Sequence, residues 1–149
     1  MKRLLTTCLM MTLIAVCADA QANLNISVFF DANSSYADDA KEVWVEGSQL
    51  RPYRLSLYRS ITTENKQTIT AMEQAVIKDG KKAADKEIGY IGSRLYYAFL
   101  SMKPATSGST VRRYVFYRNA SLKSSTKKDA TLVYMEGQIT MEELKNLFK

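Results

Sequence analysis

The alternation of apolar and polar positions predicts two strands near the start of the chain. Residues 42–46 alternate with period two, which places Val43 and Val45 on one face and Trp44 on the other. Residues 49–60 alternate in the same way, and we expect them to pair with the first strand. On this second strand, one face is expected to carry Tyr53, Leu55 and Leu57, and the other Arg54, Ser56 and Tyr58.

Two later segments show the periodicity and end signals of helices. Residues 63–79 follow a cap at Thr62 or Thr63, and their apolar positions recur at helical spacing, at Ile69, Met72 and Val76. Residues 140–143 form a capping box, because the glutamate three positions after the threonine can bond back to it. We therefore expect a short C-terminal helix over residues 140–148.

Residues 94–119 are both aromatic and basic, and they predict a β-hairpin. Two runs rich in Tyr, Phe and Val, residues 94–100 and 111–118, flank a segment with the Pro, Gly and Ser of a turn. Alternation on the first strand would place Arg94, Tyr96 and Ala98 opposite Leu95, Tyr97 and Phe99. On the second strand it would place Arg112, Tyr114, Phe116 and Arg118 opposite Arg113, Val115 and Tyr117.

The order of these segments is typical of an α+β fold. Residues 131–136 predict a last strand, and residues 83–90 predict a hairpin strand or, alternatively, a prolongation of the first helix. Residues 23–30 are a candidate first strand or an arm packed against the body. Short turns favour antiparallel pairing, so we predict a mainly antiparallel sheet of five to seven strands, one longer helix and one short terminal helix.

The first twenty residues have the three parts of a secretory signal peptide. Lys2 and Arg3 precede an apolar run over 4–16, and small residues follow at Ala18 and Ala20. Cleavage after the second alanine would leave one domain over residues 21–149. We expect that domain in the periplasm or cell envelope of a bacterium, or secreted.

Two alternatives to a cleaved signal peptide remain. A membrane anchor is one, but the apolar run is shorter than the roughly 20 residues that a spanning helix needs. Lipidation of Cys17 is the other, although Val16 before it argues against a lipoprotein signal.

Composition excludes the commonest catalytic chemistries. The chain has no histidine, and both cysteines, Cys8 and Cys17, lie in the predicted signal peptide. The mature chain would therefore lack the usual general base, the usual nucleophile systems and the commonest zinc and haem ligands. We predict a protein that is not an enzyme, with no cofactor, no metal and no catalytic residue. The enzymatic alternative is a carboxylate pair drawn from Glu42 and Glu46 or Asp85 and Glu87.

The predicted hairpin supplies the candidate binding face. Its Tyr and Arg side chains would form an aromatic platform edged by guanidinium groups, suited to sugar rings and to carboxylate or phosphate. In the alternative interpretation that face is core, and its exposed residues serve cross-strand packing and cation–π contacts. The candidate ligand-binding residues are Arg94, Tyr96, Arg112, Tyr114, Arg118 and, as a neighbour, Trp44.

The charge of the chain narrows the class of partner. The formal net charge is +6, and it falls to +5 without Lys2, Arg3 and Asp19. For an exported protein this excess favours anionic polysaccharide, lipid head groups or cell-wall polymer rather than nucleic acid. We therefore favour a non-enzymatic binding module of the cell envelope with an anionic or carbohydrate ligand. The alternative is a structural or assembly subunit that binds another envelope protein through a sheet edge.

Short segments distributed over the mature chain carry a family resemblance. They are residues 42–47, 50–55, 85–90, 94–97 and 131–137, followed by the acidic helix start at 142–144. Together they resemble a family of small exported bacterial proteins classed only as a domain of unknown function. The resemblance implies strands, a helix, four more strands and a terminal helix, with a glycine shortly before that helix, as at Gly137. It implies no catalytic residues.

Overall fold

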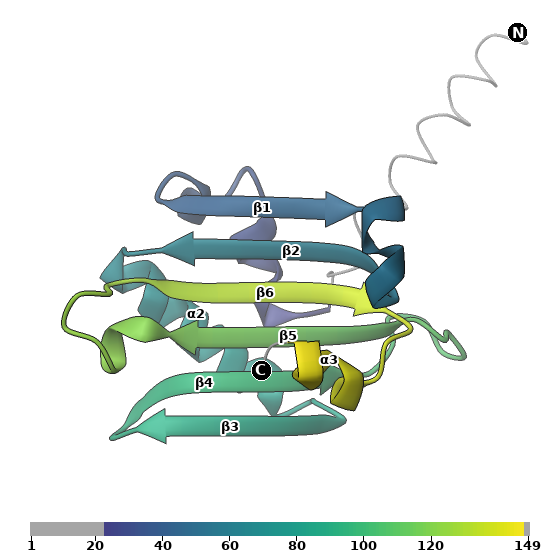
Figure 1. Ribbon diagram of the computed structural model, residues 1–149. Helices are drawn as coiled ribbons and strands as arrows, with labels where there is room; N and C mark the ends of the chain where they lie inside the picture. Colours follow the sequence, from purple (N-terminus) through teal and green to yellow (C-terminus); the bar gives the residue numbers. More distant parts are fainter. Residues whose placement is uncertain (1–22, 148–149) are drawn as a thin grey trace, which may run out of the picture.

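A computed structural model describes residues 23–147 of the protein, and its centre is a six-stranded antiparallel sheet (Figure 1). The strands lie in the order β1-β2-β6-β5-β4-β3. They are β1 (Ala40–Glu46), β2 (Leu55–Thr63), β3 (Asp85–Ile91), β4 (Arg94–Met102), β5 (Arg112–Asn119) and β6 (Ala130–Gly137). The helices are α2 (Lys66–Gly80) and α3 (Met141–Leu147). This architecture confirms the predicted α+β class, while the predicted signal peptide and residue 148 lie outside the described residues.

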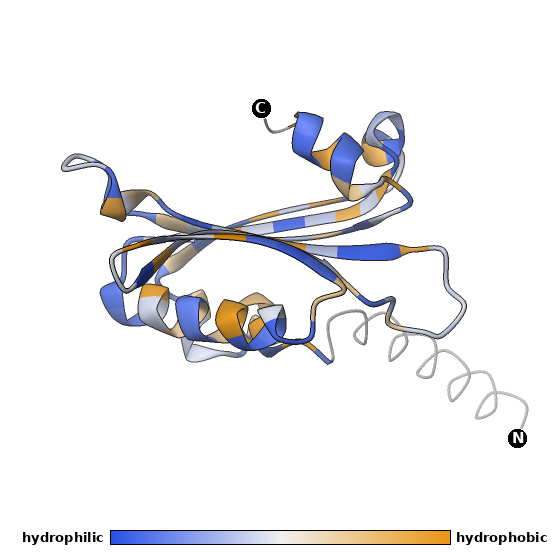
Figure 2. Ribbon diagram, turned by 90° about the horizontal axis from the view of Figure 1, so that it is seen from below, coloured by the Kyte–Doolittle hydropathy of each residue, from blue (hydrophilic) through white to orange (hydrophobic). Residues whose placement is uncertain are grey.

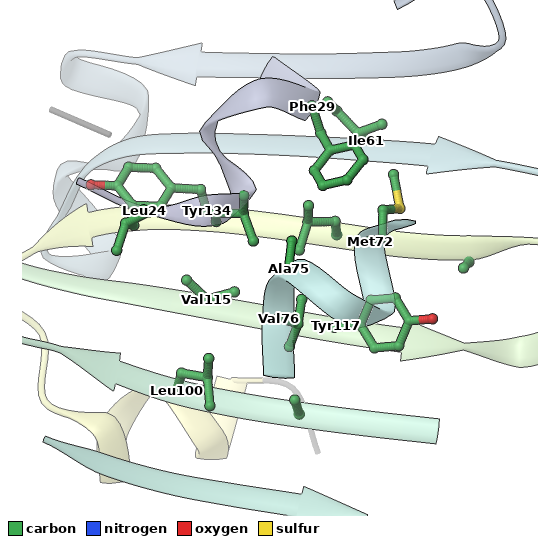
Figure 3. Packing of buried hydrophobic residues seen from close by; sticks show 14 of the residues in the cluster. Leu24, Phe29, Ile61, Met72, Ala75, Val76, Leu100, Val115, Tyr117 and Tyr134 are labelled. Carbon is green, nitrogen blue, oxygen red and sulfur yellow. The ribbon is translucent and has the colours of Figure 1, made fainter. Parts of the chain in front are cut away.

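The two faces of the sheet are covered unequally. Helix α2 and the 3₁₀ helix η2 (Asn25–Phe30) pack on one face, here the α2 face, whose core is shown in Figure 3. Helix α3 and the 3₁₀ helix η4 (Ser48–Tyr53) pack on the other, here the α3 face. Figure 2 shows α2 running beneath the sheet and α3 lying over one end of it. Part of the α3 face is therefore left without a helix above it.

Helix α2 forms where its apolar stripe was predicted, but its cap is a different residue. The Asn65 side chain accepts hydrogen bonds from the backbone N–H groups of Gln67 and Thr68, at 3.0 and 3.1 Å. The predicted cap at Thr62 or Thr63 is wrong, because β2 continues through Thr63. The helix buries Ile69, Met72, Ala75 and Val76 against the sheet, as an amphipathic surface helix should.

The predicted capping box of α3 is confirmed. The Thr140 N–H donates to Glu143 Oε2 at 2.8 Å, and the Glu143 N–H donates to Thr140 Oγ1 at 3.2 Å. Leu144 is fully buried against the sheet and fixes the helix there. Across residues 23–147, no helix combines the length and apolar character that crossing a membrane requires.

The N-terminal segment is an arm rather than a strand. Residues 25–30 form η2, whose buried side chains join the core of the α2 face. The Asp79 carboxylate, fully buried at the end of α2, accepts bonds from the backbone N–H groups of Asn25 and Ile26, at 2.8 and 3.1 Å. It also accepts a bond from the Asn25 side chain at 2.8 Å. One buried carboxylate thus fixes the arm.

The start of the second predicted strand is also corrected. Residues 48–53 form η4, and Arg54 closes it in the left-handed conformation with φ of 56°. A β-bulge between Leu55 and Leu57 then changes the alternation of β2. Leu55 packs in the core of the α3 face and Leu57 against that of the α2 face. The prediction that these two leucines share a face is therefore wrong.

A second bulge changes the alternation of β4. Gly89 pairs with Tyr97, but the next residue, Tyr90, pairs with Leu95, so Tyr96 is an extra residue. Leu95 consequently packs on the α2 face, while Tyr97 and Phe99 lie on the α3 face. The predicted Leu95–Tyr97–Phe99 face is wrong for this reason. On β5 the alternation holds: Tyr114 and Phe116 lie on the α3 face, and Val115 and Tyr117 on the α2 face.

Candidate functional site

A groove lies on the α3 face where strands β3, β4 and β5 meet the exposed side of α3. Its volume is about 310 Å³. We call it the aromatic groove; it is lined by Glu87, Tyr96, Tyr97, Phe99, Phe116, Arg118 and Lys145. Six of these residues come from the sheet, and Lys145 alone comes from the helix.

Cross-strand pairs between β4 and β5 build the floor of the groove. Phe99 lies opposite Phe116, and Tyr97 lies opposite Arg118. The Phe116 ring contacts those of Tyr97 and Phe99 edge-on, with both centroid distances at 6.0 Å. Phe99 is buried, whereas Tyr97 and Phe116 are half-buried. The sheet thus presents packed aromatic rings on a face that α3 does not fully cover.

A charged wall closes one side of the aromatic groove. Lys145 Nζ lies 2.6 Å from Glu87 Oε2. Hydrogen bonds from Lys145 and from the Tyr97 hydroxyl hold the pKa of the exposed Glu87 carboxyl below its usual range. Burial, together with the bond to Glu87, raises the pKa of Tyr97 to about 12. Near neutral pH, this wall therefore carries a carboxylate and a protonated phenol beside Lys145.

The opposite rim is cationic. The Arg118 side chain is exposed, and its Cζ lies 5.8 Å from the centroid of the Tyr96 ring. Lys123 Nζ lies 4.3 Å from the same centroid. Within residues 23–147, no carboxylate lies within ion-pair distance of Arg118. Its guanidinium group keeps its forked donors available at the rim of the groove.

The chain matches one described family over residues 13–148, the family of unknown function DUF6108. This match spans most of the sequence. The protein belongs to DUF6108. Membership confirms the predicted relation to a domain-of-unknown-function family. No curated protein and no solved structure matched this member of DUF6108.

The six predicted binding residues of this DUF6108 protein do not form one surface. Tyr96 and Arg118 line the aromatic groove. Tyr114 is fully buried, and its hydroxyl donates to the Ile139 carbonyl at 2.6 Å. Arg112 lies at the other end of β5 and donates to the Gln138 carbonyl at 2.8 Å.

The remaining two predicted residues do not line the groove either. The Arg94 guanidinium pairs with the buried Glu73 of α2, at 2.8 Å. Trp44 is 57% exposed on β1, where its ring lies 4.0 Å from Arg59 Cζ. The predicted platform therefore divides among both faces and one edge of the sheet.

Sequence reasoning missed three kinds of groove residue. Tyr97 and Phe99 were assigned to the wrong partners because the Tyr96 bulge is invisible to strict alternation. Glu87 was considered only as part of a carboxylate pair. Lys145 becomes a wall residue only because α3 folds back over the sheet, and no local pattern signals this. The pairing of aromatic β4 and β5 was the one available signal.

Each of the two acidic pairs considered for catalysis in this DUF6108 member lies within a single edge strand, and the two strands are at opposite edges of the sheet. Glu42 is on β1, where it pairs with Arg59, and Glu87 is on β3, where it pairs with Lys145. Glu46 and Asp85 belong to the same two edge strands. In the described part of the chain, no cluster of three or more acidic, His or Cys side chains is arranged to hold a metal ion.

Proposed function

We propose that this protein is an exported binding protein of the bacterial cell envelope, and that the aromatic groove holds an acidic saccharide. The unpaired Arg118 guanidinium beside a packed aromatic floor is the observation that carries the proposal. The volume of about 310 Å³ lies at the lower end of the range for small-molecule sites, which suits one or two sugar rings.

Each part of the groove matches a different part of such a ligand. The aromatic rings offer apolar contact to the flat C–H face of a sugar. Arg118 can bind a carboxylate through two parallel hydrogen bonds, a geometry that lysine does not provide. The Glu87–Lys145 pair offers an acceptor and donors to sugar hydroxyl groups. Export, inferred from the signal-like first twenty residues, would bring the protein to such saccharides.

The test compares two arginines on the same strand and the same face. Arg118→Ala removes the guanidinium at the groove, whereas Arg112→Ala removes an exposed guanidinium at the other end of β5. The probe is an oligomer of hexuronic acid, with a neutral oligosaccharide of equal length beside it. Binding is measured by isothermal titration calorimetry at two salt concentrations.

The two variants should differ clearly. Loss of a charge-assisted pair costs about 1.5–3 kcal/mol, so Arg118→Ala should weaken uronate binding by about tenfold or more. Arg112→Ala should change it by less than about twofold, apart from a small salt-dependent effect. Equal losses in both variants, or an equal affinity of the wild type for the neutral oligomer, would reject the acidic saccharide as the ligand.

One observation favours a second candidate function, that of an assembly subunit. Edge strand β1 is exposed on both faces, with Val43 52% and Trp44 57% exposed. An extended segment of another polypeptide could pair with its free backbone groups and contact these side chains. In analytical ultracentrifugation, the apparent mass of the protein mixed with its partner should then rise with concentration. Val43→Lys should abolish this rise. A mass unaffected by this substitution counts against β1 as the interface.

A further inference from the structure

A second depression lies beside α2, apart from the aromatic groove. It is formed by the first turns of α2, the start of β4 and the loop between β5 and β6, and its volume is about 520 Å³. We call it the basic hollow. Its polar lining includes Glu64, Lys66, Thr70, Arg94, Asn119, Ser121, Ser124, Ser125, Lys127 and Lys128.

The charges around the basic hollow are unbalanced. Arg94 is paired with Glu73 and is therefore compensated. Among the described residues, Lys66, Lys127 and Lys128 have no acidic partner within ion-pair distance. Only one lining residue, Glu64, adds a further carboxylate. Three uncompensated ammonium groups from two distant segments thus converge on one concave surface, which raises the local concentration of anions.

The loop that carries two of these lysines is held in shape by its own side chains. Asn119 Oδ1 accepts a bond from the Ser121 N–H at 3.1 Å. Ser124 Oγ accepts bonds from the N–H groups of Thr126 and Lys127, at 3.2 and 3.1 Å. The backbone at Lys127 is therefore held by local hydrogen bonds before any ligand binds, which reduces the entropy cost of ordering the loop.

A further donor lies beside the lysines. The exposed Ser125 hydroxyl lines the hollow. A neutral donor beside ammonium groups suits an oxyanion with several acceptor oxygens.

We propose that the basic hollow binds a ligand that carries a diphosphate or two neighbouring phosphate groups. Several lysines acting as point charges are a recurrent means of binding phosphate, and the two-sided placement of Lys66 and of Lys127 with Lys128 fits an extended anion. This site is independent of the saccharide proposed for the aromatic groove, because the two depressions share no lining residue.

The test uses inorganic pyrophosphate as the probe and two matched double variants. Lys127→Ala with Lys128→Ala removes two exposed charges from the hollow. Lys81→Ala with Lys82→Ala removes two exposed charges from the other end of α2, outside the hollow. Binding is followed by calorimetry and by amide chemical shifts at constant ionic strength. Unchanged thermal midpoints establish that both variants fold.

We expect only the variant altered in the basic hollow to lose affinity for pyrophosphate. The first double variant should bind pyrophosphate at least about tenfold more weakly, whereas the second should stay within about twofold of the wild type. Absence of pyrophosphate binding in the wild type, or equal losses in both variants, overturns the proposal. Arg118→Ala should leave pyrophosphate binding intact, which separates this outcome from that of the groove.

A second experiment identifies the kind of molecule that supplies the phosphate groups. Vesicles of phosphatidylcholine with and without diacylglycerol pyrophosphate are sedimented with the wild type and with both double variants. Co-sedimentation that requires this diphosphate lipid together with Lys127 and Lys128 assigns the site to a lipid head group. Pyrophosphate binding without co-sedimentation assigns it to a soluble phosphorylated molecule.

Discussion

Gly137 allows the last strand to pass unusually close to the segment that precedes β2. A Cβ atom at this position would lie 2.4 Å from the Arg54 carbonyl oxygen and 2.8 Å from Leu55 Cα. Both atoms belong to the backbone, so no side-chain rotation can relieve the contact. The same carbonyl accepts bonds from the N–H groups of Gln138 and Ile139, at 3.0 and 3.2 Å. These bonds lead the chain from β6 to α3.

Gly137→Ala should therefore destabilise the protein substantially. Forcing a methyl group into this contact costs about 1–3 kcal/mol. Displacing Arg54 also weakens two backbone hydrogen bonds, each worth about 1 kcal/mol. The lower entropy of alanine in the unfolded chain returns about 0.4–1 kcal/mol. We expect a net loss of about 2–4 kcal/mol in the free energy of unfolding.

Urea denaturation followed by circular dichroism measures this loss, and Gly89→Ala is the matched control. Gly89 also lies within a strand, but a Cβ there would meet only a Tyr97 ring carbon at 3.6 Å, an ordinary contact. That substitution should leave stability unchanged or raise it by up to about 1 kcal/mol. A Gly137→Ala protein within about 0.5 kcal/mol of the wild type would refute the close approach at Arg54.

Three further predictions concern single ionisable groups. Asp79→Ala leaves two backbone N–H groups of η2 without their acceptor, and should lower the unfolding free energy by about 2–4 kcal/mol and remove protection of those amides in hydrogen exchange. The bonds from Thr140 hold the pKa of Glu143 below 4.5, so its stabilising contribution is complete above that pH and is lost as the pH falls through the lowered value. Glu143→Gln should reduce the fall of the thermal midpoint as the pH is lowered into the acid range. An unchanged fall contradicts this. The Glu87 carboxylate contributes to the raised pKa of Tyr97, which is about 12. Glu87→Gln should therefore lower the pKa of Tyr97 in a spectrophotometric titration, while burial keeps it above 10.0.

The elements that carry a regular local sequence pattern were predictable. The stripe of α2 and the capping box of α3 are local signals, and the structure contains both elements. The errors fall where one extra residue interrupts a strand. Bulges at Leu55–Leu57 and at Tyr96 reverse the alternation of faces, and strict alternation with period two cannot predict where a bulge occurs. The 3₁₀ helices at residues 25–30 and 48–53 were missed because the few apolar positions in such short segments do not distinguish a 3₁₀ helix from a strand.

The candidate site was predictable in part. The hairpin between β4 and β5 does supply the aromatic floor, and Arg118 and Tyr96 were named from residue type alone. Tyr114 could not be separated from them, because its burial depends on the return of residues 137–139 over β5. Arg94 likewise required knowledge of Glu73 on α2, a contact between segments 21 residues apart.

The shape of the aromatic groove depends on whether the short helix α3 is folded and docked on the sheet. A helix of seven residues is marginal in isolation, so α3 depends on the burial of Leu144 and on contacts with the sheet, including the Lys145–Glu87 pair. Undocking α3 would remove one wall of the groove while leaving its floor intact. A ligand that contacts Lys145 must therefore stabilise the docked helix, and every substitution that loosens α3 must reduce affinity by the same thermodynamic linkage. Slower hydrogen exchange in α3 would thus report occupancy of the groove without any label on the ligand.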